Sequence, residues 1–226
     1  MVSKAKYRHE YKYPITACDR EILKTRLAQV MKLDKHAGPT GQYLIRSLYF
    51  DNFDDKAYFE KVEGTNPRSK FRIRIYNNSD SIITLEKKSK VGELTQKLQA
   101  RITREEYEKI VAGDIDWMLT DGRGVVAELY AQMKGYSLKP KTLVEYTRMP
   151  FIYDPGNVRV TIDMSVRTGL FSDNLFDPTP LVPTGELDVL EVKFDEYLPD
   201  IIRYLVSPVS RDRQSFSKYE ICRKFG

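Results

Sequence analysis

Charged and apolar residues alternate in several short segments spread along the chain. In KFRIR, for example, the cations Lys70, Arg72 and Arg74 are separated by single apolar residues. Successive side chains of a β-strand point to opposite faces, so such a segment has one charged face and one face suited to a hydrophobic core. Polar and charged groups also recur two residues apart in RHEYK, LEKKSK, VRVTID and LEVKF. The pattern predicts strands whose charged faces line a shared basic cavity.

The alternative interpretation is an open sheet whose charged face is solvated, because antiparallel sheets often keep one face in water. A solvated face should carry more Thr, Ser and Gln and a better balance of positive and negative charge. The bias toward Arg and Lys recurs across the five segments. This recurrence favours the shared cavity over the open sheet.

Eight segments of the chain are predicted to form strands. They lie at about residues 5–13, 43–52, 68–77, 81–89, 93–102, 141–153, 157–168 and 185–195. Strand follows strand more often than a helix intervenes, which predicts mainly antiparallel pairing. We therefore expect a single α+β domain over residues 1–226, built on a closed antiparallel eight-stranded β-barrel with helices packed outside. Such a barrel has room inside for side chains or for one small ligand.

Helix start signals occur at two places. Thr16 with Asp19, and Thr103 with Glu106, have the spacing of helix N-terminal capping boxes, and the apolar spacing after the first box continues to Met31. Further helices are expected at about residues 54–64, 123–135 and 215–225 and from Pro199 onward. We expect the first of these helices to pack on the outside of the sheet.

The composition narrows the class of partner. The chain has 226 residues and a formal net charge of +5, an excess of cations that favours anionic partners without choosing among them. Nucleic acid is not expected, because the chain has neither a Lys/Arg cluster nor a nucleic-acid-binding motif. No segment approaches the roughly 20 apolar residues of a membrane span. We expect a soluble cytoplasmic protein that a separate membrane protein could recruit.

Several kinds of catalytic chemistry lack their residues in this sequence. The chain has no glycine-rich phosphate loop and no HExxH motif, and its two histidines lack partners for a nucleophile pair. Its two cysteines lie near opposite ends of the chain without CxxC spacing, which is typical of reduced thiols. Arg, Lys and carboxylates remain, and these groups bind phosphate and hard divalent cations.

Two arginines are the first candidates for phosphate binding. Arg72 and Arg74 share one face of a predicted strand, about 7 Å apart by strand rise, which suits adjacent phosphoryl groups. Further cations could neutralise the rest of a phosphate chain: Lys88, Lys90, Lys97, Arg148, Arg159, Lys193 and Lys218. The acids on the same faces are Glu10, Glu86, Asp163 and Glu191. Some of these acids should form salt bridges, and at least one should coordinate a metal that bridges phosphate oxygens.

At these residues the chain resembles a known family, the polyphosphate polymerase (vacuolar transporter chaperone, VTC) domain of the triphosphate tunnel metalloenzyme (CYTH-like) superfamily. The similar segments occur in family order between residues 8 and 220: RHEYKY, IRSLYFDN, KFRIRIY, LEKKSK, VEYTR, VRVTID, VLEVKF and FSKYE. Each segment is weakly specific, and together they cover nearly the whole chain.

The resemblance implies an eight-stranded basic tunnel, open at both ends, that uses Mn²⁺ or Mg²⁺. It implies that the enzyme transfers the γ-phosphoryl group of ATP to a growing polyphosphate chain. The implied phosphate contacts are Lys12, Arg72, Arg74, Lys88, Lys97, Arg148, Arg159 and Lys218, and the implied metal ligand is Glu191. One departure bears on the branch: Arg8 stands where the hydrolase and cyclase branches carry a glutamate, which argues against a second metal site.

The leading hypothesis is a metal-dependent phosphotransferase. We expect Arg72, Arg74, Lys88 and Lys193 to stabilise the moving phosphoryl group. The residues expected to bind the other phosphates are Lys12, Lys70, Lys90, Lys97, Arg148, Arg159 and Lys218. The residues expected to hold the metal are Glu191, Glu10 and Glu86. The alternatives are a hydrolase of tripolyphosphate or nucleoside triphosphates and a non-catalytic polyphosphate-binding module; the sequence does not give the oligomeric state.

Overall fold

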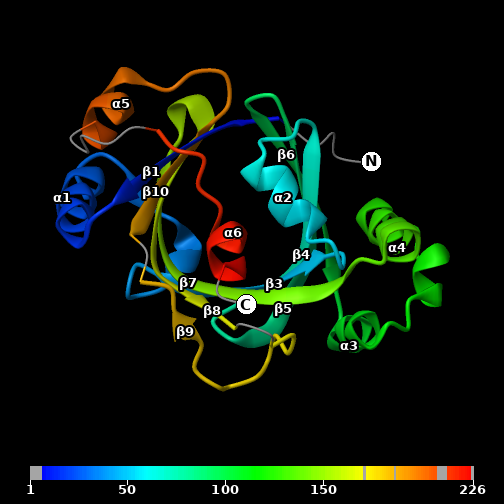
Figure 1. Cartoon of the computed structure of the whole chain (residues 1–226). Helices are drawn as coiled ribbons and strands as arrows, with labels where there is room; N and C mark the ends of the chain where they lie inside the picture. Colours follow the sequence, from blue (N-terminus) through cyan, green and yellow to red (C-terminus); the bar gives the residue numbers. More distant parts are fainter. Residues whose placement is uncertain (1–6, 170–171, 186, 208–212, 225–226) are drawn as a thin grey trace.

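The main sheet of the protein is antiparallel and strongly curled (Figure 1). The computed structural model describes residues 7–169, 172–185, 187–207 and 213–224. The sheet has the strand order β1-β10-β8-β7-β3-β4-β5-β6. These strands are β1 (His9–Ile15), β3 (Tyr43–Asp51), β4 (Arg68–Tyr76), β5 (Ser79–Val91), β6 (Leu94–Ile102), β7 (Lys139–Tyr153), β8 (Val158–Thr168) and β10 (Asp188–Phe194). Two short strands, β2 (Lys32–Leu33) and β9 (Val182–Pro183), pair with β7 and β8.

The eight strands predicted from the sequence all appear, but the closed barrel is only partly confirmed. The edge strands of the curled sheet meet at a single antiparallel bridge, where the backbones of Arg8 and Thr95 exchange hydrogen bonds of 3.0 and 3.1 Å. A continuous ladder between β1 and β6 is not formed in the described part of the chain. The sheet is therefore a partly open barrel whose two edges touch at one point.

The first strand runs further than its sequence indicated. The prediction ended it at residue 13, before Pro14, whereas β1 continues to Ile15. Proline has no backbone N–H and is tolerated on edge strands, where one side of the strand needs no ladder partner. In the sheet order β1 is an edge strand, and Pro14 pairs on its one covered side with Val189.

Helices lie on both faces of the sheet. In the described residues they are α1 (Ala17–Ala28), α2 (Lys56–Val62), α3 (Arg104–Ala112), α4 (Gly124–Tyr136), α5 (Asp200–Val206) and α6 (Lys218–Arg223), with short 3-10 turns η1 (Lys35–Ala37), η2 (Asp116–Leu119) and η3 (Pro155–Asn157). Helices α3 and α4 pack on the apolar side of β4, β5 and β6 around Ile73 and Leu85, and α1 and α5 pack on the apolar side of β8 and β10 around Val160. The alternation in the sequence thus places the apolar residues of these strands outward, under the helices, and their charged residues inward.

Helices α2 and α6 are exceptions to the predicted exterior helices, and α2 packs beside α6 through Ala57 and Tyr58. Figure 1 shows α6, near the C-terminus, inside the curl of the sheet. Its Tyr219 ring stacks on Tyr49 of β3 at 5.1 Å, and its Lys218 ammonium lies 2.5 Å from the Asp163 carboxylate of β8. The expectation that every helix packs outside the sheet was therefore wrong. Six residues of mixed polarity gave no periodic signal that could have placed this helix.

Local signals in the sequence produced the expected turns and caps. Both predicted capping boxes form, with Thr16 and Thr103 each accepting from a backbone N–H three residues later. Asn77 and Asn78 form the hairpin between β4 and β5 with φ of 51° and 54°, the left-handed conformation that asparagine tolerates in such turns. No helix in the described part of the chain is long and apolar enough to cross a membrane.

Asp51 joins β3, α2 and α6. Its carboxylate accepts hydrogen bonds from the backbone N–H groups of Ala57 and Tyr58 at the start of α2 and from the Tyr219 hydroxyl at 2.5 Å. The side chains of Asp51 and Tyr219 are both buried. A charge-assisted hydrogen bond of this kind stabilises more than a neutral one. Asp51 therefore fixes α6 inside the sheet from the end of a central strand.

Replacing Tyr219 by phenylalanine should lower the free energy of unfolding by about 1–2 kcal/mol, because Asp51 then loses one partner in a buried place. Urea denaturation of the purified protein measures the change. Tyr204→Phe is the matched control, because the Tyr204 side chain is 75% exposed, and it should leave stability unchanged. Equal stability of Tyr219→Phe and the wild type would show that this hydrogen bond does not hold α6.

Candidate functional site

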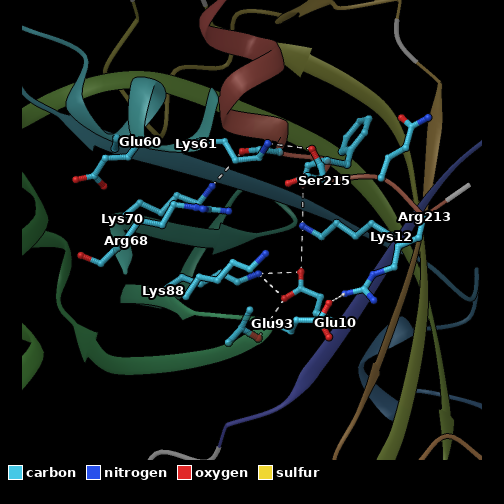
Figure 2. Close-up of a pocket in the computed structure, with 17 residues that line it drawn as sticks. Glu10, Lys12, Glu60, Lys61, Arg68, Lys70, Lys88, Glu93, Arg213 and Ser215 are labelled. Carbon is cyan, nitrogen blue, oxygen red and sulfur yellow. Dashed lines mark hydrogen bonds and ion pairs between the residues drawn. The ribbon is translucent and has the colours of Figure 1, made fainter. Parts of the chain in front are cut away.

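The concave face of the sheet and the start of α6 enclose a polar cavity of about 60 Å³, here called the inner site. Its lining residues are Lys12, Tyr49, Lys70, Arg72, Arg74, Lys88, Tyr146, Arg148, Glu191, Lys193, Ser217 and Lys218. A larger cavity of about 310 Å³, here called the mouth, adjoins it and shares Lys12, Lys70, Lys88 and Ser217 with it (Figure 2). The structure therefore brings most of the predicted cations together on one surface.

Four buried carboxylates hold these cations in place. Each of them lies directly opposite a cation on the neighbouring strand: Glu10 opposite Lys193, Glu191 opposite Lys12, Glu86 opposite Arg72, and Asp163 opposite Arg148. Opposite charges at facing positions of an antiparallel pair stabilise the sheet. The side chains of these four acids are at most 5% exposed. Their negative charge therefore acts on the cations with little screening by water.

Glu86 is surrounded by three cations. Its carboxylate lies 2.6 Å from the guanidinium of Arg72, 3.9 Å from that of Arg74 and 3.2 Å from the ammonium of Lys97. Burial acts to raise the pKa of Glu86, but the cations outweigh burial and hold this pKa well below its usual range. Arg74 also donates to the hydroxyls of Ser47 and Tyr146 at 3.1 Å. The two arginines predicted to bind adjacent phosphates are thus fixed from behind by one carboxylate.

Glu10 and Glu191 form a second cluster with three lysines. The Glu10 carboxylate lies 3.0 Å from Lys12 and 2.5 Å from Lys88, and Glu191 lies 3.0 Å from Lys193. The two carboxylates also repel each other, since the Glu191 charge acts on Glu10. Burial and the Glu191 charge act to raise the pKa of Glu10, but the lysines outweigh both and lower this pKa to about 2.

Lys88 behaves differently from the other members of this cluster. Burial lowers its pKa to about 7; the Glu10 carboxylate opposes this shift, and the charges of Lys12 and Lys193 add to it. In the empty site a fraction of Lys88 is therefore neutral near physiological pH. A bound phosphate would restore its proton, because an anion beside the ammonium stabilises the charged form.

Asp163 fixes the third group of cations. The Arg148 guanidinium donates hydrogen bonds of 2.6 and 2.7 Å to the two oxygens of Asp163. The Lys218 ammonium of α6 lies 2.5 Å from the same carboxylate. Burial acts to raise the pKa of Asp163, but these two cations lower it to about 2. Arg148 also reaches Glu191 at 3.2 Å, which links this group to the cluster around Glu10.

Lys70 has no carboxylate partner among the described residues. Its ammonium donates to the Ser217 hydroxyl at 3.0 Å and lies 5.7 Å from the centre of the Tyr49 ring. Burial lowers the pKa of Lys70 well below its usual range, and the neighbouring cations Lys12 and Lys88 add to this effect. A cation left in this state has the strongest need of an external anion.

Three predicted phosphate-binding residues lie outside the inner site. Arg159 forms an ion pair with Asp34 at 2.8 Å and donates to the Tyr43 hydroxyl at 3.0 Å. Lys97 contacts Glu86 from the open side, with 47% of its side chain exposed. Lys90 lines the mouth. Strand alternation gives the face of the sheet on which each residue lies. It does not give the position of the residue along the strand relative to the inner site.

Some residues of the inner site were missed by the sequence prediction. Tyr146 and Ser47 bind Arg74, and Ser217 binds Lys70. Strand alternation could have found Tyr146, because it lies two residues before Arg148 and so shares its face. Nothing in the pattern indicated Ser217, because it reaches the site through the unpredicted insertion of α6.

The curled sheet thus combines a concave face of arginines and lysines with buried acids that hold them in place. The family model for the VTC domain matches residues 7–225 of the chain. The protein therefore belongs to the VTC-domain family, as the sequence segments indicated. No curated protein matches the sequence.

Solved structures similar to this chain agree with that fold. A Hippeastrum protein, described as having a dominant triphosphatase activity, is 14% identical with a TM-score of 0.54, covering 97% of this chain and 95% of that chain. A Bacillus halodurans protein assigned as an adenylate cyclase is 14% identical with a TM-score of 0.53, covering 92% of each chain. A Pyrococcus horikoshii protein is 13% identical with a TM-score of 0.52, and the match covers 96% of this chain and 98% of that chain. At these identities the likeness shows the fold alone.

The ionised Glu10 should make stability depend on pH. Its pKa of about 2 in the folded protein lies below the ordinary value of 4.5, so between these two pH values the unfolded chain binds more protons than the folded one. Stability from this group is therefore complete above about pH 5 and is lost as the pH falls toward 2, by about 3 kcal/mol. Urea denaturation across this pH range measures the slope.

The variant Glu10→Gln should show a smaller slope in the same measurement, since it has no proton to bind. Glu63→Gln is the control, because Glu63 lies exposed at the end of α2. The same slope in Glu10→Gln and the wild type would contradict the assignment of acid sensitivity to this cluster.

Proposed function

We propose that the protein is a metal-dependent phosphotransferase that elongates polyphosphate from ATP, using residues 1–226 as one tunnel domain. The observation that carries this proposal is the ladder of Lys70, Arg72 and Arg74 on β4, which lines the inner site together with Lys88 on the paired strand β5 and with Arg148 and Lys193. Membership of the VTC-domain family and the triphosphate tunnel fold relate the protein to enzymes that act on triphosphate and polyphosphate.

The chain's own residues would act by position and charge. Arg72 and Arg74 lie one pleat apart, about 7 Å by strand rise, and Glu86 holds both guanidinium groups toward the cavity. Phosphoryl transfer spreads negative charge over the oxygens of the moving group, and fixed cations stabilise that charge without reorganising. Lys88, on the paired strand β5, and Lys193, on β10, would contact the same group or its neighbour.

The residues of the cluster around Glu10 fit a divalent cation held together with substrate. Glu10 and Glu191 supply hard carboxylate oxygens side by side, and Mg²⁺ or Mn²⁺ is commonly bound by one or two carboxylates plus substrate phosphates. Such an ion would neutralise charge on the phosphate oxygens. The described residues contain no group of three or more acidic, histidine or cysteine side chains that could hold a metal, so substrate phosphates would have to complete the coordination. Glu86, also expected to hold the metal, lies in a separate group of cations with Arg72 and Lys97.

Arg8 supports transfer to a phosphate chain over hydrolysis. Its guanidinium lies 2.9 Å from Asp195, and its backbone forms the bridge that joins the two edges of the sheet. A cation at this position adds no ligand for a second metal, and activation of water by two metals requires such ligands. The triphosphatase activity described for the Hippeastrum protein makes hydrolysis the alternative outcome.

The direct test is incubation of the purified protein with ATP and Mn²⁺, with products resolved on a polyphosphate-stained gel beside an orthophosphate assay. We expect a ladder of long chains that is lost without metal and in Glu191→Gln. Orthophosphate without a ladder would replace the polymerase by a hydrolase. Tight binding of polyphosphate without either product would leave a binding module, which could need a separate membrane protein for activity.

The arginine ladder can be tested separately. Arg72→Gln should reduce kcat by about 10²–10³, because it removes a fixed donor from the moving phosphoryl group. Arg72→Lys should recover little, since an ammonium cannot bind phosphate in the two-pronged manner of a guanidinium. Arg26→Gln, an exposed change on α1, controls for lost charge. Full activity of Arg72→Gln would contradict the assignment.

A further inference from the structure

Arg159 on β8 extends the concave surface beyond the inner site. It occupies alternate positions of β8 with Thr161 and Asp163, and Asp163 holds Arg148 of the inner site. On the neighbouring strand β10, Lys193 lies directly opposite Arg159 and lines the inner site. Arg148 and Lys193 line the inner site but not the mouth. The concave surface therefore continues past Lys193 to Arg159 on the side away from the mouth.

The facing cations Lys193 and Arg159 are neutralised by different acids. Like charges at facing positions destabilise an antiparallel pair. The Lys193 ammonium lies 3.0 Å from Glu191 on its own strand, whereas the Arg159 guanidinium lies 2.8 Å from Asp34. Asp34 lies between β2 and η1, far from Arg159 in the chain. A loop therefore supplies this acid, whereas the four carboxylates described above all lie on strands of the main sheet.

The two carboxylate oxygens of Asp34 have different partners. Oδ1 accepts a hydrogen bond of 3.0 Å from the backbone N–H of His36 in η1, and Oδ2 lies 2.8 Å from Arg159. The backbone N–H of Asp34 donates to the Pro150 carbonyl of β7 at 3.1 Å. The loop is thus attached to the sheet through its backbone, while one carboxylate oxygen holds the arginine. Another anion can take the place of this oxygen without disrupting the sheet.

Tyr43 lies between Arg159 and the inner site. Its hydroxyl accepts from the same guanidinium nitrogen that contacts Asp34, at 3.0 Å, and on β3 it lies directly opposite Arg148. Burial raises the pKa of Tyr43, although the charges of Arg148 and Arg159 oppose this shift. The tyrosine is therefore neutral at physiological pH, and the negative charge beside Arg159 comes from Asp34.

A phosphoryl group that passed Lys193 would compete with Asp34 for Arg159. A guanidinium binds carboxylate and phosphate in the same paired geometry, so the two anions exclude each other. Displacement would leave the Asp34 side chain, which is 5% exposed, as a buried charge without its cation. Such a charge is costly. The cost falls only on anions that are long enough to reach Arg159.

We propose that Asp34 is an autoinhibitory carboxylate that occupies Arg159 and closes the side of the inner site away from the mouth to phosphoryl groups. A linear phosphate would bind as far as Lys193 and stop there. Removal of the Asp34 charge would release Arg159 and let the anion extend further. The inference rests on the proposed function, because the inner site must bind phosphate.

The test is a double-mutant cycle of Asp34→Asn and Arg159→Gln. The Kd of polyphosphate of about 25 phosphates is measured by calorimetric titration at fixed ionic strength. Asp34→Asn should bind about tenfold more tightly than the wild type, the scale of one charge-assisted contact. Arg159→Gln alone should change the Kd by less than about twofold, because Asp34 already occupies this arginine. The double variant Asp34→Asn/Arg159→Gln should lose the gain.

The control variant Asp154→Asn makes the same chemical change at an exposed position and should leave the Kd unchanged. Asparagine and serine both cap helical turns, so Asp34→Asn and a second variant, Asp34→Ser, remove the charge and keep the cap of η1. Both should show the gain. Thermal unfolding without ligand identifies which variants are folded.

Four results would overturn the inference. An unchanged Kd in folded Asp34→Asn and Asp34→Ser would leave the ion pair a purely structural one. A gain that persists in the double variant would not come from Arg159, and an equal gain in Asp154→Asn would come from net charge. A large loss of affinity in Arg159→Gln alone would show that the anion already reaches Arg159. Failure of the wild type to bind polyphosphate or tripolyphosphate would refute the inference together with the proposed function.

Discussion

The structure depends on how a large number of cations is held on the concave side of one sheet. Four buried carboxylates, on β1, β5, β8 and β10, each face a cation on the neighbouring strand and also contact others. Taking ions out of water is costly, and it is compensated only where opposite charges meet with good geometry. The acids therefore fix the arginines and lysines in position without cancelling all their charge. An anionic ligand would neutralise the remaining positive charge and would favour the protonated form of Lys70.

Helix α6 connects this electrostatic arrangement to the rest of the fold. Asp51, at the end of β3, caps α2 and binds Tyr219, while Asp163 binds Lys218 one residue earlier. The helix is thus held from two sides by buried acids. This attachment presents Ser217 to Lys70 and makes the start of α6 part of the lining of the inner site. A short helix of little intrinsic stability is kept in place by contacts that also shape the site.

Much of the strand pattern and of the charged face followed from local sequence. Alternation in KFRIR and VRVTID predicted which side chains face inward, because the side-chain period of a strand is fixed. Long-range features did not follow. The incomplete closure between Arg8 and Thr95, the position of α6 and the pairing of Arg159 with Asp34 all depend on segments distant in sequence. The three cations around Glu86 are a further example, because which cations surround an acid depends on strand register and not on its neighbours in the chain.

We propose that the concave face is an anion-binding site whose cations repel one another when no anion is bound. Thermal unfolding with and without tripolyphosphate, at constant ionic strength, tests this claim most directly. A ligand that binds only the folded protein raises stability by about 2.7 kcal/mol at one hundred times its Kd. We expect a saturable rise in Tm with tripolyphosphate that sulfate at equal ionic strength does not reproduce. The variant Arg72→Gln should show a smaller rise. The same small rise with both anions, in wild type and variant alike, would contradict it.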